Sequence, residues 1–404
     1  MAYDLLEGVR VVEVSMYAFA PSAAAVLADW GADVVKVVPP TVADPMMGTP
    51  IARLPEKDVG VAFMWEILNR GKRCIALDVS VADGQVVLHD LVRDADVFIT
   101  NLLPDARRRF HLDVDDLQAV NPRLVYGRAT GHGDRGPERE QGGYDITDFW
   151  ARTGIGHAAS QVSDEFVPLI CPAFGDLTSG AFLAGGIAAA LFRRERTGQG
   201  GVVDVSLLSS GMWSISPGVV AAQLYDIETI PRFRHAESPN PLVAAYTTRD
   251  GRQIYLSGIM TEGVFENFCA LLGHPELGTD ARFADGRARV THAAECIAAL
   301  DAVFAERDLA EWREILAGLR TPWMVVQSTA ESGRDVQVAA NDMVVQVDGP
   351  VGPYPLVASP AQLDGVAPSL SRAPDHGEHT EEILLELGRT WDDIIALKER
   401  GAVL

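Results

Sequence analysis

The first 130 residues alternate short β-branched runs with helical stretches, and this rhythm constrains the fold more than any other feature of the sequence. Because parallel strands need a crossover connection, such alternation is typical of a parallel sheet covered by helices. Further along, an apolar helical stretch at 177–194 precedes another strand. We therefore predict an α/β fold with a Rossmann-like parallel-sheet large domain, with strands at 9–14, 32–38, 73–77, 96–100, 124–128 and 202–207.

The character of the sequence changes at about residue 217, where a proline-rich segment begins. The segment 245–258 predicts a hairpin, because Asp250-Gly251 suits a tight turn between two strands. Helical patterns follow to about residue 330. We predict a smaller α+β domain, with these boundaries: large domain 1–216 with 361–404 packing back onto it, linker 217–235, small domain 236–330 and return linker 331–360.

The composition excludes several classes of protein. The 404 residues include 56 acidic and 34 basic side chains, a net charge of −22, which argues against nucleic acid and anionic membranes as partners. The four cysteines are far apart, which fits a reducing cytoplasm, and the acidic N-terminus does not resemble a signal peptide. The longest apolar run, 181–192, is too short to span a bilayer. We expect a cytoplasmic protein without a membrane or nucleic-acid partner.

Two common kinds of site are missing from the sequence. No G-x-G-x-x-G follows the first strand, which disfavours a nicotinamide oxidoreductase. His376 and His379 have no third ligand in their segment, so we predict no metal site.

Asp176 is the candidate nucleophile. It lies between Gly175 and Gly180 at the start of the apolar helical stretch, where unpaired N–H groups and the helix dipole stabilise an anion. The flanking glycines leave room for a ligand. Since aspartate is also among the best capping residues, an ordinary N-cap is the alternative interpretation.

Two basic clusters interrupt the acidic background. Arg70, Lys72 and Arg73 form the first, and the run 107–109 follows Asn101 in the second. Each lies beside a strand end, where open α/β sheets bind ligands, so phosphate capture is one interpretation. A solvated helix face is the other.

Several segments together closely resemble the family III CoA transferases, the group that includes formyl-CoA transferase, carnitine CoA transferase and α-methylacyl-CoA racemase. The resemblance runs nearly end to end, and its strongest pieces are LADWGADVVKV (27–37), NRGKRCIALDV (69–79), FITNLLPDARRRF (98–110), the GD at 175–176, RTGQGGVVDVSLL (196–208) and PDHGEHTEEILLELG (374–388).

The resemblance implies a CoA-dependent transferase in which Asp176 attacks an acyl-CoA donor, becomes an aspartyl-CoA thioester and passes CoA to a carboxylic acid acceptor. Coenzyme A acts as co-substrate, without a metal. The family also implies a homodimer of interlocked ring-like chains. The residues expected near CoA are Arg70, Lys72, Arg73, Asn101, Leu102 and Arg109, with Met16, Tyr17 and Ala18 along the thiol arm.

Three departures from the family pattern narrow the expected reaction. The racemase branch has a histidine where this chain has Tyr144, and a phenol exchanges protons poorly at neutral pH, so we expect transfer rather than racemisation. The glycine run of formyl-CoA transferase is missing around 239–260, and its glutamine is replaced by Ala18. We therefore expect an acceptor larger than oxalate.

Two rival functions stay open within the family. One is an acyl-CoA racemase in which another residue, such as His157, supplies the base. The other is a non-catalytic acyl-CoA-binding subunit of a heteromeric transferase, against which the presence of Asp176 argues. The sequence identifies neither the donor nor the acceptor, and it leaves homodimer and heteromer open.

Overall fold

The computed structural model describes residues 4–48, 54, 59–258, 263–319 and 321–404. This part of the chain forms two compact units. The first is built from residues up to 157, 166–229 and 336–404, and the second from 158–165 and 230–335.

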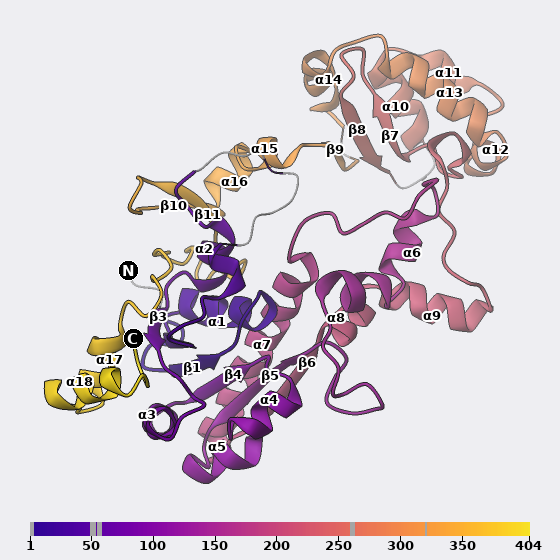
Figure 1. The fold of residues 1–404 in the computed structure, drawn as a ribbon. Coiled ribbons are helices and arrows are strands. Elements are labelled where there is room, and N and C mark those ends of the chain that lie inside the picture. The colour runs from indigo at the N-terminus through magenta and orange to yellow at the C-terminus, as the bar shows by residue number, and fades with distance from the viewer. Residues whose placement is uncertain (1–3, 49–53, 55–58, 259–262, 320) are drawn as a thin grey trace. The chain divides into compact units, whose positions relative to one another are not determined.

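A six-stranded parallel sheet forms the centre of the first unit, in the order β3-β2-β1-β4-β5-β6 (Figure 1). The predicted α/β fold and its six strands are confirmed. The strands are β1 (Arg10–Val14), β2 (Asp33–Val38), β3 (Arg73–Ala76), β4 (Val97–Thr100), β5 (Val125–Thr130) and β6 (Gly201–Ser206).

Helices occupy the connections between these strands. They are α1 (Phe19–Asp29), α2 (Phe63–Asn69), α3 (Ala82–Arg93), α4 (Pro104–Arg109), α5 (Val114–Val120), α6 (Ile155–Ser160), α7 (Phe174–Thr197), α8 (Leu207–Ser214) and α9 (Ser216–Tyr225), with the short turns η1 (Pro45–Met47) and η2 (Asp145–Ala151). The C-terminal part adds α16 (Val336–Ala340), the hairpin β10 (Val344–Val347) and β11 (Tyr354–Val357), α17 (Thr380–Glu386) and α18 (Trp391–Glu399).

The two faces of the sheet have separate apolar cores, because side chains of a strand alternate between faces. Val12 and its neighbours Val35 and Phe98 pack with α3, α5, α17 and α18. Val11 and the residues beside it pack on the other face with α1 and α7. Figure 1 shows α1 and α7 on one side of the strands and α3 and α5 on the other.

The second unit has its own core under a three-stranded antiparallel sheet in the order β7-β8-β9. The predicted hairpin is present as β7 (Val243–Thr247) and β8 (Gln253–Ser257). The other elements are β9 (Trp323–Val325), α10 (Val264–Leu272), α11 (Pro275–Thr279), α12 (Gly286–Thr291), α13 (Ala293–Phe304), α14 (Leu309–Leu316), α15 (Thr329–Ser332) and η3 (His235–Glu237).

The two segments predicted as linkers contain regular structure. The first includes most of α9, and the second includes α16 and the β10–β11 hairpin. The sequence analysis treated the prolines as signs of a linker. Pro217, however, lies in the first turn of α9, where a backbone N–H has no acceptor within the helix, so a proline does not disturb the helix there. In addition, residues 158–165 belong to the second unit although they precede α7.

Helix α7 is longer than the apolar run 181–192 on which we based the expectation of no membrane segment. Among the described residues it is the one helix whose length and apolar composition would suffice to cross a bilayer. Its buried residues, Leu183 and Ile187 among them, belong to the core that α7 shares with α1 and the sheet.

Candidate active site

A cavity of about 310 Å³ opens at the carboxyl ends of the central strands, the place where open parallel sheets bind ligands. Its walls come from the loops after β1, β4 and β5 and from the start of α7. Seven of the predicted site residues line it: Met16, Tyr17, Ala18, Asn101, Leu102, Tyr144 and Asp176.

Asp176 is the third residue of α7, so the interpretation as an ordinary N-cap is wrong. The cap position is occupied by Ala173, which has a left-handed backbone (φ 59°). The first turn is instead held by the carboxylate of Asp145, which accepts from the Gly175 N–H at 3.0 and 3.1 Å. A side chain at Gly175 would collide with the Phe149 ring and with Asp145, so only glycine fits there.

Both carboxyl groups have raised pKa values, and the charge of Asp145 acts on Asp176. Burial, and secondarily the charge of Asp145, raise the pKa of Asp176 to about 7. Burial also raises the pKa of Asp145 to about 6, although the N–H groups at the start of α7 oppose this. We expected the helix terminus to keep Asp176 ionised. The structure corrects this, because removal of the carboxylate from water outweighs the helix dipole.

The loop after β1 is held against the loop after β4. The side chain of Asn101 accepts from Met16 N–H at 3.1 Å and donates to Met16 O at 2.6 Å. Tyr17 follows with a left-handed backbone (φ 65°), and its ring meets the Tyr144 ring edge-on at 6.0 Å between centroids. The two phenols therefore share one wall of the cavity with Asp176.

The first basic cluster does not line the cavity. The Arg70 side chain is buried and donates hydrogen bonds to both carboxylate oxygens of Asp29, at 2.9 and 2.7 Å. Arg73 begins β3 and pairs with Asp33 at the start of β2, so it lies at the amino ends of the strands, opposite the cavity. Its predicted position beside the ligand has to be corrected, since the resemblance does not reveal at which end of a strand a side chain lies.

Lys72 is fully buried and bonded to Glu13 at 2.6 Å, to Pro21 O at 2.9 Å and to Asn69 at 3.0 Å. All three of its N–H groups are used, so the geometry does not support the predicted contact with CoA phosphates.

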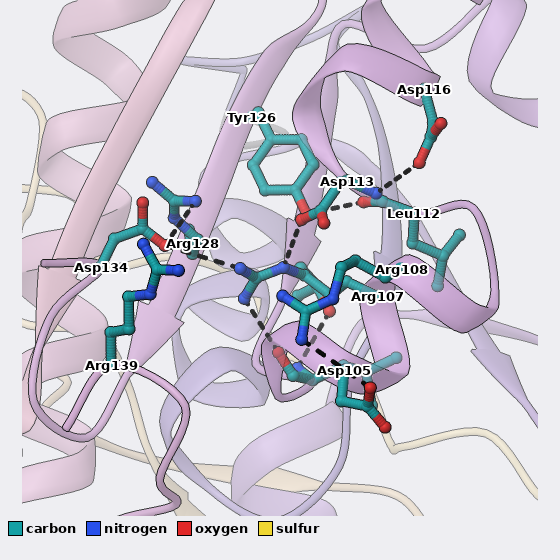
Figure 2. Close-up of polar contacts among 12 residues, drawn as sticks. Asp105, Arg107, Arg108, Leu112, Asp113, Asp116, Tyr126, Arg128, Asp134 and Arg139 are labelled. Carbon is teal, nitrogen blue, oxygen red and sulfur yellow. Dashed lines mark hydrogen bonds and ion pairs between the residues drawn. The ribbon is translucent and has the colours of Figure 1, made fainter. Parts of the chain in front are cut away.

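Of the second basic cluster, Arg107 lines the cavity, and Figure 2 shows its polar contacts. Arg107 bonds to Asp113 at 2.7 Å and to Leu102 O at 3.0 Å, and Arg128 bonds to Asp134 at 2.8 Å. Arg109 does not line the cavity and lies over the Phe110 ring at 4.5 Å. Arg107 and Arg139 do line it. The sequence analysis considered Arg107 only as a member of the run 107–109 and did not consider Arg139.

Other candidates are placed away from the cavity. His157, the substitute base of the racemase alternative, is exposed and lies 3.7 Å from Glu228. His379 accepts from Cys74 N–H at 3.3 Å. In the described ranges no group of three or more histidine, cysteine or acidic side chains could hold a metal ion. The segment 239–260, where a glycine run was sought, ends in two residues outside the described structure.

These features define an α/β protein with a ligand cavity at the carboxyl ends of a parallel sheet and, in its wall, an aspartate whose pKa is raised. The sequence profile of CoA-transferase family III matches residues 6–380. The chain belongs to this family and acts as a CoA-transferase.

The chain is similar to two bacterial enzymes over almost its whole length. It is 29% identical to a cinnamoyl-CoA:phenyllactate CoA-transferase of Clostridium sporogenes, covering 98% of this chain and 96% of that protein. It is 30% identical to an (R)-2-hydroxy-4-methylpentanoate CoA-transferase of Clostridioides difficile, covering 99% of each. The fold matches a CAIB/BAIF family protein from Brucella suis with a TM-score of 0.82 and 28% identity, covering 95% of this chain and 99% of that one.

Proposed function

We propose that the protein transfers CoA from an acyl-CoA donor to a free carboxylic acid through an aspartyl-CoA thioester on Asp176. The observation that carries this proposal is the position of Asp176, a half-buried carboxyl in the wall of the cavity at the carboxyl ends of the strands.

The reaction proceeds by four acyl exchanges. A carboxylate oxygen of Asp176 attacks the thioester carbonyl, the C–S bond breaks, and CoA leaves as a thiolate from a mixed anhydride. The thiolate then attacks the aspartyl carbonyl and releases the donor acid as a carboxylate. The acceptor carboxylate attacks the resulting thioester and again expels the thiolate. Attack of the thiolate on the acceptor carbonyl forms the new acyl-CoA and restores Asp176, so no net oxidation or proton uptake occurs.

The environment of Asp176 suits this chemistry. A carboxylate with a pKa of about 7 is a stronger nucleophile than an ordinary aspartate, provided that it is ionised. The apolar wall formed by Phe19, Leu103 and Leu207 limits access of water, which would hydrolyse the anhydride.

Tyr144 is proposed to orient the substrate or to donate to an anhydride oxygen. Tyr144 lies in the cavity wall, and among the described residues that line this cavity there is no histidine to exchange an α-proton. A racemase would incorporate deuterium at the α-carbon of a 2-methylacyl-CoA in heavy water. We expect no incorporation, and rapid α-deuteration by the wild type would favour the racemase alternative.

We propose that the acceptor is a 2-hydroxy acid with an apolar side chain. Both similar enzymes have such an acid in their names, phenyllactate and 2-hydroxy-4-methylpentanoate. The phenols of Tyr17 and Tyr144 and the apolar side chains of the wall provide matching surface.

CoA is proposed to follow the loop of Met16, Tyr17 and Ala18 and the backbone at Asn101 and Leu102, with its phosphates toward Arg109. Among the cavity-lining cations, Arg139 is the exposed one, 3.4 Å from Glu140, so it offers a second contact for a phosphate.

We propose a homodimer of interlocked chains in the cytoplasm. The chain leaves the first unit after residue 229 and returns at 336, as a ring requires. Trp213, Leu224 and Tyr225 on α8 and α9 are 70–76% exposed and suit a protein interface. The four cysteines are free, which agrees with a reducing compartment.

Acyl-CoA donors incubated with a panel of 2-hydroxy acids, dicarboxylates and steroid acids, and read by mass spectrometry, test the proposed transfer. We expect a new acyl-CoA from a 2-hydroxy acid with an apolar side chain. Formation of new CoA esters from none of these acids would contradict the proposal.

A further inference from the structure

A buried cluster of charged side chains lies directly behind the cavity wall. Its members are Glu13 on β1, Lys36 on β2, Lys72 before β3 and Asp44 before η1, all with side chains at most 2% exposed. The chain contains only four lysines among its 34 basic residues, and two of them lie in this cluster. With both lysines protonated the four charges sum to zero, although burial lowers the pKa of Lys72 to about 7. Burial alone would raise the pKa of Glu13, but the two ammonium groups outweigh burial and lower it to about 2.

Each ammonium group has three partners, the number that a lysine can satisfy. Lys36 bonds to Glu13 at 3.0 Å and to Ser15 O at 3.2 Å, and lies 3.4 Å from Asp44. Lys72 bonds to Glu13, Pro21 O and Asn69, as described above. Lys72 therefore has no N–H left for a ligand phosphate, whereas Lys36 donates two hydrogen bonds and meets Asp44 only as an ion pair.

The two backbone oxygens held by the lysines belong to Ser15, directly after β1, and to Pro21, in the first turn of α1. We use the term loop 15–21 for this segment, which comprises the connection after β1 and the first three residues of α1. Residues 16–19 of this loop line the cavity, and Asn101 holds the loop near its start, at Met16. Tyr17 adopts its left-handed backbone inside this loop, a conformation that persists for a non-glycine residue only when its surroundings enforce it.

The loop is also connected to Asp176. Ser22, the residue after the loop, donates from its hydroxyl to Phe19 O at 2.7 Å and to Asp176 O at 3.2 Å. The close approach of α1 to α7 is possible because residue 180 is glycine: a Cβ there would lie 1.9 Å from the Ser22 hydroxyl. Displacement of the loop would therefore change the position of Asp176 relative to the cavity wall.

We propose that Lys36, Lys72 and Glu13 are positioning residues that hold the loop 15–21 in a fixed position relative to Asp176. This inference rests on the proposed function, because it takes the cavity as the site of acyl transfer. It assigns Lys72 a role behind the cavity wall in place of the predicted contact with CoA phosphates.

The test removes one anchor without leaving an unbalanced buried charge. The double variant Glu13→Gln with Lys72→Met keeps Lys36 and Asp44 as a neutral pair but loses the bond to Pro21 O. Lys398→Met, which removes an exposed lysine paired with Glu381, is the control. We measure kcat and KM with the acyl-CoA donor, the affinity for 3′-phospho-ADP by calorimetry, and amide hydrogen exchange of residues 15–21.

We expect kcat of the double variant to fall by about 10- to 100-fold, because a displacement of about 1 Å in a reacting site has an effect of this size. Amide exchange in the loop should become faster, and the affinity for 3′-phospho-ADP should stay within twofold of the wild type. Weaker binding of 3′-phospho-ADP with unchanged kcat would overturn the proposal and return Lys72 to phosphate binding.

A second pair covers the case in which the first variant does not fold. Lys36→Met with Asp44→Asn removes the anchor at Ser15 O with the same charge balance and should lower kcat likewise. Unchanged kcat and loop exchange in this folded variant would also overturn the proposal. Failure of the proposed function itself would be visible separately, as absence of CoA transfer by the wild type.

Discussion

The carboxyl pair of Asp145 and Asp176 predicts a defined pH dependence. Asp176 reacts as a carboxylate, and its pKa is about 7, so kcat/KM for the donor should rise with pH and level off above that value. We choose Asp145→Asn as the perturbation, because an asparagine oxygen can still accept from Gly175 N–H while the negative charge is lost.

The size of the effect follows from the causes of the shift. The rise in the pKa of Asp176 from its usual 3.8 to about 7 means that the folded protein disfavours the ionised form by at most about 4 kcal/mol. This free energy is smaller to the extent that water reaches the carboxyl group. Burial is the larger cause and the charge of Asp145 the smaller one. Loss of that charge should therefore lower the midpoint by up to about one pH unit, which raises the ionised fraction at about pH 6 by up to about fivefold.

The assay is kcat/KM for donor acyl-CoA from pH 5 to about pH 9, in the wild type and in Asp145→Asn. Because CoA phosphates also titrate, CoA affinity over the same range in Asp176→Asn serves as the control. An unchanged midpoint, or a midpoint at higher pH, would refute the electrostatic coupling.

The stability of the protein gives a second readout. Because the pKa of Asp176 is higher in the folded state than in the unfolded chain, the stability that Asp176 contributes is fully present below about pH 4. This contribution is lost as the pH rises through about 7.

Three further variants test separate parts of the site. Gly180→Ala should destabilise the fold by about 1–3 kcal/mol in urea unfolding and lower kcat, since the new Cβ would meet Ser22, whereas Gly185→Ala, which has open space at its Cβ, should do neither. Tyr144→Phe should slow transfer without abolishing it, and complete loss of activity would show that the hydroxyl is indispensable. Arg109→Ala should weaken CoA binding by about 1–3 kcal/mol in calorimetry, and unchanged affinity would make Arg109 part of a solvated surface.

The parallel sheet could be predicted because its strands are short β-branched runs buried on both faces, and such runs are visible in sequence. The regular elements inside the two predicted linkers, α9 in the first and α16 with the β10–β11 hairpin in the second, could not be predicted, because local proline chemistry does not distinguish a helix start from a loop. The hairpin of β10 and β11 depends on contacts with Val61 and Ile67, which are distant in sequence.

The site could be predicted where it depends on strand ends, as for Asn101 and the loop at Met16. It could not be predicted where it depends on burial. The pKa of Asp176 follows from the packing of α1 against α7, and the role of Lys72 follows from Glu13, 59 residues earlier in the chain. Asp145 directly follows Tyr144 in a segment that the sequence analysis did consider, but its contact with Gly175 exists only in the folded chain.

The central claim is that Asp176 carries CoA covalently. Wild-type protein is incubated with donor acyl-CoA in the absence of acceptor, treated with hydroxylamine, and digested for peptide mass spectrometry. We predict a hydroxamate on Asp176, formed as hydroxylamine displaces CoA from the aspartyl thioester, and neither this modification nor turnover in Asp176→Asn. Modification of another residue, or substantial transfer by Asp176→Asn, would contradict the account.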